Sequence, residues 1–224
     1  MRTLLRDGLF ALSLAVAIVT TALAFSLLNV AAAPPHKIDG GLVHHPDSSF
    51  RLAYVKPGAN FAKFKTIQLR TLEIPPDARD GGSGQTRRFR ESYILGDKEV
   101  AALQSAYSDT MRDILGKAGF NFVDTPAADT LIVAPVVMKI RLNAPIENTR
   151  VGYSGRGRTY SRGGGSITIG AVLADGSSGE VLAQVVDHSY PSAFWRINNR
   201  VTNLADARQA FAQWARALRD TLRS

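Results

Sequence analysis

The sequence predicts an α+β fold: one small domain in which two helices pack on one face of a sheet of about five strands. Two segments, residues 97–117 and 204–222, repeat apolar residues at helical spacing. Shorter β-rich segments are bounded by glycine, proline and other turn residues. Strands and helices come in runs, not in strict alternation, which favours a sheet with helices on one face. The chain of 224 residues is long enough for one such domain and an appendage.

Both predicted helices have recognisable ends. The first is expected over residues 97–117, where Asp97 suits the N-cap and Gly119 suits the C-terminal cap. Its apolar residues recur every three to four positions, so one face is expected to pack against the sheet. The second helix is expected over residues 204–222, with Asn203 as its N-cap.

The predicted strands include one clear β-hairpin. Two β-rich runs flank the Gly-containing turn at residues 175–179, which is typical of a hairpin. A long strand is expected to bend at Pro135, because proline lacks the N–H that a central ladder uses. The segments that predict strands are residues 50–55, 65–74, 120–123, 129–142, 167–174 and 180–188.

Residues 1–32 predict a secretory signal peptide or a membrane anchor. Arg2 and Arg6 precede a stretch that is almost wholly apolar over residues 9–30, and small residues follow. Cleavage before Ala33 is one interpretation. An uncleaved anchor is the other, because about 20 apolar residues span a bilayer. Both interpretations export the domain, either free in the periplasm or held there by an inner-membrane anchor.

Residues 33–49 predict a linker, since proline, glycine and serine punctuate them, and the α+β domain is expected over residues 50–224. The absence of cysteine excludes disulfides, thiolate metal sites and lipid attachment at an N-terminal cysteine. The formal net charge is +8, and nearly all of the excess belongs to the domain. A basic exported domain suits anionic lipid, acidic polysaccharide or an acidic protein, unless the charge serves solubility alone.

Arginine gathers in two polar, Gly-rich segments. The longer one, residues 150–165, places arginine and tyrosine on glycine spacers and holds no acidic residue. Such side chains bind carboxylates, phosphates or sugar rings, whereas the plain alternative is a solvated loop between two strands. Nucleic acid is not an expected partner of an exported domain. The candidate contacts to a partner or anion are Arg150, Arg156, Arg158, Tyr160, Arg162, Arg87, Arg88 and Arg90.

Four possible metal ligands lie close together near the N-terminus of the expected domain. His36, His44, His45 and Asp47 are suitable for copper or zinc. They lie in the predicted linker, however, where no geometry is fixed and the spacing matches no known motif. The sequence therefore predicts neither a metal site nor a cofactor.

Residues 187–189 place an aspartate, a histidine and a serine next to one another. Adjacent residues of a strand point to opposite faces, so these three cannot form a catalytic relay among themselves. The chain is therefore predicted not to be an enzyme. Phe194 and Trp195 follow soon after, and they are expected to cover the sheet edge or the last helix, with partner docking as the alternative.

Several short motifs, weak singly, resemble a known family in their order and spacing. They are Tyr54-Val55-Lys56-Pro57-Gly58-Ala59, Thr66-Ile67-Gln68-Leu69, Gly119-Phe120, Val123-Asp124, Gly179-Glu180-Val181-Leu182-Ala183 and Ala210-Phe211-Ala212-Gln213-Trp214-Ala215. The pattern resembles the uncharacterised bacterial lipoprotein family called domain of unknown function 3313, over about residues 50–222. The resemblance implies a small α/β envelope domain without an assigned activity or catalytic residue. Such proteins usually carry a cysteine for lipid attachment, which this sequence lacks.

These observations lead to two functional hypotheses. The first is a non-enzymatic accessory protein of the cell envelope that binds a protein partner or an anionic polymer. It is motivated by export, a small α+β domain and two basic segments. The second is a periplasmic carrier of a small molecule or a metal, motivated by the histidines and by a possible pocket beside the sheet. The oligomeric state is left open.

Overall fold

A mixed sheet of eight strands forms the frame of the domain, in the order β1-β2-β3-β9-β8-β6-β4-β5. Neighbouring strands are antiparallel from β1 to β6 and parallel across β6, β4 and β5. The strands are β1 (Lys37–Ile38), β2 (Leu42–His44), β3 (Leu52–Val55), β4 (Thr66–Leu69), β5 (Asn121–Phe122), β6 (Thr130–Leu142), β8 (Gly165–Asp175) and β9 (Val181–Ser189).

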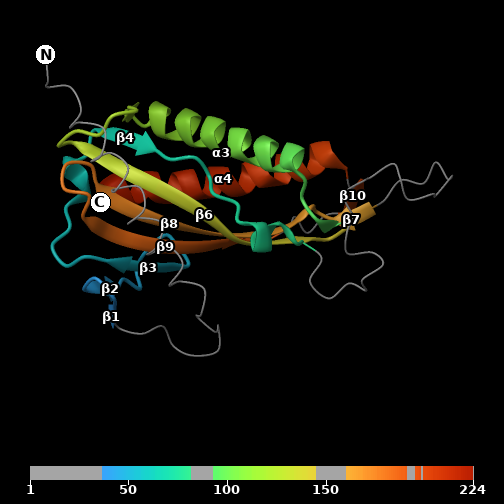
Figure 1. Cartoon of the computed structure of the whole chain (residues 1–224), viewed down its shortest axis with the longest axis horizontal. Coiled ribbons are helices and arrows are strands. Elements are labelled where there is room, and N and C mark those ends of the chain that lie inside the picture. Colours follow the sequence, from blue (N-terminus) through green and yellow to red (C-terminus); the bar gives the residue numbers. More distant parts are fainter. Residues whose placement is uncertain (1–36, 82–92, 145–159, 191–194, 198, 224) are drawn as a thin grey trace, which may run out of the picture.

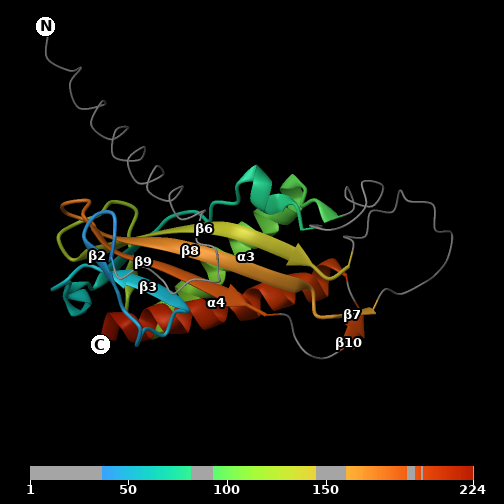
Figure 2. The ribbon, with the colours of Figure 1, turned by 90° about the horizontal axis from the view of Figure 1, so that it is seen from below.

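The computed structural model describes residues 37–81, 93–144, 160–190, 195–197 and 199–223 (Figure 1). Two further strands, β7 (Tyr160–Arg162) and β10 (Trp195–Ile197), pair with each other in a small antiparallel ribbon. Figure 2 shows this ribbon at the opposite end of the domain from the C-terminus. The predicted signal or anchor over residues 1–32 lies outside the described residues.

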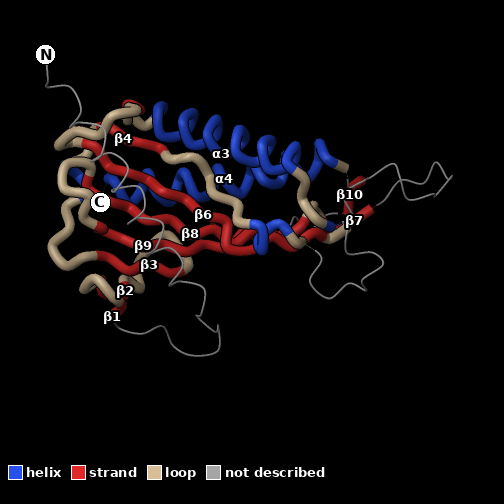
Figure 3. Tube along the Cα trace, viewed as in Figure 1, coloured by secondary structure: helices blue, strands red, loops and turns tan. Residues whose placement is uncertain are grey.

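Two long helices, α3 (Asp97–Lys117) and α4 (Arg200–Arg223), lie side by side on the same face of the sheet (Figure 3). The α+β class and the two helices on one face are therefore confirmed. Both helices begin at the end of the domain that carries the ribbon (Figures 1 and 2). Neither is long and apolar enough to cross a membrane, nor is any other helix among the described residues.

The expected number of about five strands is too small. The predicted linker over residues 33–49 contributes β1 and β2 to the edge of the sheet, and Leu42 of β2 is fully buried. Strands of two or three residues are too short to show an alternating pattern, so the sequence does not reveal them. The sheet thus begins before residue 50, where the domain was expected to start.

The helix ends differ slightly from the predicted ones. Gly96, not Asp97, is the N-cap of α3, and its N–H donates to the carboxylate of Glu99 at 3.2 Å. The helix α4 begins before Asn203, where Asn199 and Thr202 exchange hydrogen bonds between side chain and backbone at 3.0 Å each. This reciprocal pair is a capping box, which satisfies N–H groups that the first turn leaves free.

Pro135 lies inside β6 without disrupting the sheet. On one side it faces Ala171 of β8, and on the other side β4 has already ended at Leu69. Its carbonyl still accepts a hydrogen bond from the N–H of Glu73 at 3.1 Å. The ladder irregularity lies beyond the proline, between Val137 and Lys139. The proline is tolerated because the neighbouring strand no longer needs its missing N–H.

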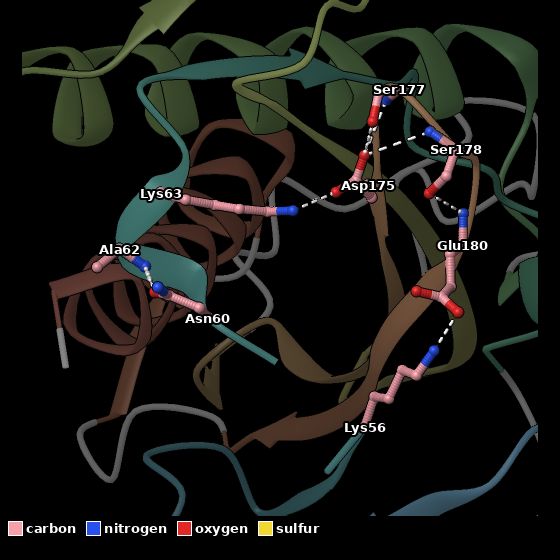
Figure 4. A network of polar contacts seen from close by, with 8 residues as sticks. All are labelled: Lys56, Asn60, Ala62, Lys63, Asp175, Ser177, Ser178 and Glu180. Carbon is pink, nitrogen blue, oxygen red and sulfur yellow. Dashed lines mark hydrogen bonds and ion pairs between the residues drawn. The ribbon is translucent and has the colours of Figure 1, made fainter. Parts of the chain in front are cut away.

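The predicted hairpin is confirmed, and its turn is held by a buried carboxylate (Figure 4). Asp175 accepts hydrogen bonds from the backbone N–H groups of Ser177 at 2.9 Å and Ser178 at 3.3 Å. Lys63, from the short helix η2 (Phe61–Lys63), forms an ion pair with the same carboxylate. The ion pair and these hydrogen bonds hold the pKa of Asp175 far below its usual range. The turn between β8 and β9 is thereby tied to the segment between β3 and β4.

The depressed pKa of Asp175 predicts a stability that depends on pH. The substitution Asp175→Asn is expected to lower the free energy of unfolding by about 2 kcal/mol at neutral pH, because the ion pair with Lys63 is lost and the buried hydrogen bonds to the backbone are no longer made to a charged group. A carboxylate whose folded pKa lies below the unfolded value of about 4 stabilises the protein fully above that value, and this stabilisation is lost progressively as the pH falls towards the folded pKa. The difference between the two proteins should therefore shrink as the pH falls from about 5 to 2. Urea unfolding across this range measures it.

Asp39 supplies a matched control, since it is exposed. Asp39→Asn is expected to change the free energy of unfolding by less than about 0.5 kcal/mol at neutral pH. A deficit of Asp175→Asn that stayed constant between pH 7 and pH 2 would contradict the role of the charge.

Candidate functional site

A groove of about 410 Å³ opens between the two helices and the sheet, at the end where both helices begin. Its walls are the first turns of α3 and α4, and its floor comes from the end of β6 and the beginning of β8. Ile140, Leu142 and Ile167 contribute apolar side chains to the floor, while Leu103 and Leu204 line the walls. The volume falls within the range of about 300–1,000 Å³ that is usual for small-molecule sites.

The groove exists because small residues occupy the beginning of both helices. Ala102 of α3 and Ala207 and Ala210 of α4 line it. Farther along, where the helices press on the middle of the sheet, Met111 and Trp214 are large and buried. The same apolar stripes thus fill the space between helices and sheet at one end and leave it open at the other.

The rim of the groove carries charges of both signs. The carboxylate of Asp206 accepts a hydrogen bond from the backbone N–H of Gly164 at 2.7 Å, and Glu99 is engaged at the N-cap of α3. Lys98 also lines the groove and is exposed, without a hydrogen bond or ion pair to any residue that the structure describes. The carboxylates of Asp206 and Glu99 therefore accept hydrogen bonds from backbone N–H groups, and the body of the groove is apolar.

A pair of glycines joins the ribbon to the groove. Gly164 and Gly165 line the groove directly after β7. Gly165 has a φ of +142°, and a Cβ there would lie 1.9 Å from the carbonyl oxygen of Arg141. A Cβ on Gly164 would lie 2.7 Å from the side chain of Asn203 on α4. Only glycine fits this junction, where strand and helix approach closely.

Two of the eight predicted contact residues are described. Tyr160 and Arg162 lie two positions apart on β7 and are both exposed. The guanidinium carbon of Arg162 lies 5.8 Å from the centre of the Trp195 ring on β10. The other candidates lie outside the described residues, so their role as contacts stays a prediction; they are Arg87, Arg88, Arg90, Arg150, Arg156 and Arg158.

The expectation that Trp195 covers the sheet edge or the last helix is wrong. Its side chain is 66% exposed on the ribbon, and Tyr190, just after β9, is 70% exposed. The core is formed by side chains of α3, α4 and the sheet, and it does not include Trp195 or Tyr190. Phe194 lies outside the described residues.

The side chains of Asp187 and His188 lie on opposite faces of the sheet, because adjacent residues of a strand point in opposite directions. Asp187 lines a small cavity beneath α4 with Trp214, and burial raises the pKa of its carboxyl group. His188 faces the other way, where its Nδ1 lies 2.8 Å from the hydroxyl of Thr168. Burial lowers the pKa of His188, and the nearby charge of Arg51 lowers it further. The two side chains therefore do not form a relay.

The possible metal ligands named from the sequence form no cluster in the part of the chain that the structure describes. His44 lies in β2, and its ring centre is 5.6 Å from that of Tyr54. His45 follows β2, where its N–H donates to the carbonyl of Ala53. Across the described residues, no three His, Cys, Asp or Glu side chains gather in a possible metal site. His36 is not among them.

The sequence matches the family model described as protein of unknown function, DUF3313, over residues 41–218. The chain belongs to this family. The predicted family is thus confirmed. No protein with curated annotation matches this DUF3313 chain.

Solved structures resemble this DUF3313 domain only distantly. A PelC dodecamer from Paraburkholderia phytofirmans is 12% identical with a TM-score of 0.40, over 75% of this chain and 94% of that one. Protein XCC0632 from Xanthomonas campestris, of family DUF330, is 12% identical with a TM-score of 0.43, over 74% and 86%. A DUF4136 protein from Bacteroides thetaiotaomicron is 16% identical with a TM-score of 0.33, over 79% and 97%. Similarity at this level does not indicate a function for this chain.

The sequence suggests a possible pocket beside the sheet but does not locate the groove, although the chain holds a signal for it. The apolar stripe of α4 changes along its length from Ala207 and Ala210 to Phe211, Trp214 and Leu218. Alanine on the buried face of a helix indicates either a close approach or an empty space. Which of the two applies depends on what faces the alanines, and only the structure shows this.

The glycine junction provides a test of the groove's architecture. Gly165→Ala is expected to lower the free energy of unfolding by about 3 kcal/mol, because the new Cβ meets a backbone oxygen at a φ that suits glycine alone. Gly116→Ala is the matched control, since a Cβ at this helical position meets open space. It is expected to raise stability by up to about 1 kcal/mol. Urea unfolding of both variants checks this, and a Gly165→Ala protein as stable as the wild type would contradict the junction.

Proposed function

We propose that this protein is an exported, non-enzymatic binding protein of the bacterial cell envelope, and that its groove holds the apolar chain of an amphiphilic small molecule. The groove of about 410 Å³ is the observation that carries the proposal. It is large enough for such a chain, and its floor offers aliphatic side chains from two strands. Export rests on the sequence pattern of residues 1–32.

The lining favours an apolar chain over a sugar or a nucleotide. The floor and walls are aliphatic, and the polar groups lie at the rim, where Lys98, Gln209 and Gln213 are exposed. Apolar ligand surface gains about 25 cal/mol for each Å² removed from water, so the chain supplies most of the affinity. The rim holds charges of both signs, and it therefore selects weakly among head groups.

Binding of a protein partner or an anionic envelope polymer is a second candidate function. The exposed aromatic rings of Tyr160, Tyr190 and Trp195 favour it, because large apolar side chains exposed together mark interaction sites. They lie at the same end of the domain as the groove, so the two functions are compatible. Absence of enzymatic activity remains part of the proposal, supported by the separation of Asp187 from His188.

Photolabelling in native envelopes tests the groove directly. A dodecanoic acid with a diazirine in its chain is expected to label peptides of α3 and α4 that line the groove. Ala102→Phe places a ring in the groove and displaces about two methylene groups of the ligand, each worth ~0.8 kcal/mol. Labelling should therefore fall roughly tenfold. Peptide mass spectrometry measures the yield at each site.

Ala101→Phe is the matched control, because Ala101 is the neighbouring residue and faces solvent. This variant should be labelled as strongly as the wild type. Equal labelling of both variants, or labelling of the wild type confined to other parts of the chain, would show that the groove does not bind the acyl chain.

A further inference from the structure

The ribbon of β7 and β10 presents a second surface, distinct from the groove. Alternate residues of a strand share a face, which places Tyr160 beside Arg162 on β7. Arg162 lies directly opposite Trp195 on β10. The 5.8 Å between the guanidinium carbon and the centre of the Trp195 ring is a cation–π distance. Two aromatic rings and one cation therefore form a single platform.

The rings of the platform are exposed to solvent, and hydrogen bonds on the opposite side hold the backbone of β7. Tyr160 is 55% exposed and Trp195 is 66% exposed. Ser161, which faces the other way, is buried, and its hydroxyl donates to the carbonyl of Gly163 at 2.6 Å. The amide of Asn143 donates to the carbonyl of Arg162, which ties β7 to the end of β6. These bonds hold the backbone of β7 in place, and a backbone that is already ordered lowers the entropy lost on binding.

We propose that this platform binds an acidic polysaccharide, with the rings of Tyr160 and Trp195 against the sugar faces and Arg162 on a carboxylate. The C–H faces of a pyranose ring are apolar and pack on flat aromatic surfaces. A guanidinium donates two parallel hydrogen bonds to a carboxylate, which a lysine does not match. The repeat unit that fits both features is a uronic acid.

The charges around the platform favour a polyanion. Arg162 has no acidic partner among the described residues, and neither described strand of the ribbon carries an acidic residue. The whole chain has a net charge of +8, which attracts a long anionic polymer from a distance. A neutral glycan leaves Arg162 unused, whereas a polyanion without rings leaves Tyr160 and Trp195 unused. This inference does not depend on the groove.

Calorimetric titration of the full chain with oligogalacturonate, in nonionic detergent at physiological ionic strength, tests the proposal. Trp195→Ala and Arg162→Gln are each expected to weaken binding about tenfold. Arg216→Gln is the charge-matched control, because Arg216 is exposed on the C-terminal half of α4. It should weaken binding less than about twofold. Melting temperatures within about 2 °C of the wild type confirm that the variants fold.

Two further probes separate the sugar from the charge. Methyl-esterified oligogalacturonate keeps the rings and loses the carboxylates, and polyglutamate keeps the carboxylates and loses the rings. Both should bind at least about tenfold more weakly. The proposal is overturned if Trp195→Ala binds oligogalacturonate like the wild type, or if polyglutamate binds as tightly. Ala102→Phe should leave this binding unchanged, so failure of the groove and failure of the platform give different results.

Discussion

The structure depends on one packing constraint: α3 and α4 bury their apolar stripes together on the same face of β6, β8 and β9. Phe211 stands at the centre with no exposed area, edge-on to Tyr107 at 5.5 Å and beside Trp214 at 5.5 Å between ring centres. Aromatic side chains bury more area than any others, so this cluster locks both helices to each other and to the sheet. The direction of α3 follows from its place as the crossover helix between β4 and the parallel strand β5. With α4 beside it and starting at the same end, the groove and the ribbon both lie at the end where the helices begin.

The domain is consequently asymmetric. At the end where the helices finish, large side chains fill the space above the sheet, and a short ion pair closes the turn between β8 and β9. At the other end, alanines leave the groove open. All large apolar side chains that are exposed among the described residues lie near the groove end, on the ribbon, after β9 or beside the first turns of the helices; they are Ile94, Tyr160, Tyr190, Trp195 and Val201. One end of the domain is thus closely packed, and the other exposes large apolar side chains, which is typical of an interaction surface.

Local patterns made most of the fold predictable. The bounds of α3 follow from its apolar period and from Gly119, whose φ of +97° ends the helix. The hairpin follows from its turn, whose Asp175 provides acceptors for two backbone N–H groups. The edge strands β1 and β2 were not predictable, because pairing of two or three residues depends on β3 being in place. Trp195 was expected to cover the sheet edge or the last helix, and only the structure shows that its side chain is exposed on the ribbon.

The two proposed sites adjoin and yet suit different chemistry, and the glycine junction is the reason. Gly164 and Gly165 let β8 continue from the ribbon while passing close to α4, so the groove closes against the sheet on one side of the junction and the ribbon projects on the other. In the groove, Asp206 is held by the backbone of that same junction and aliphatic side chains dominate. On the ribbon, the guanidinium of Arg162, which has no acidic partner among the described residues, lies over the exposed ring of Trp195. A substitution that shifted the junction would move both surfaces, whereas changes at Ala102 or Trp195 act on one of them alone.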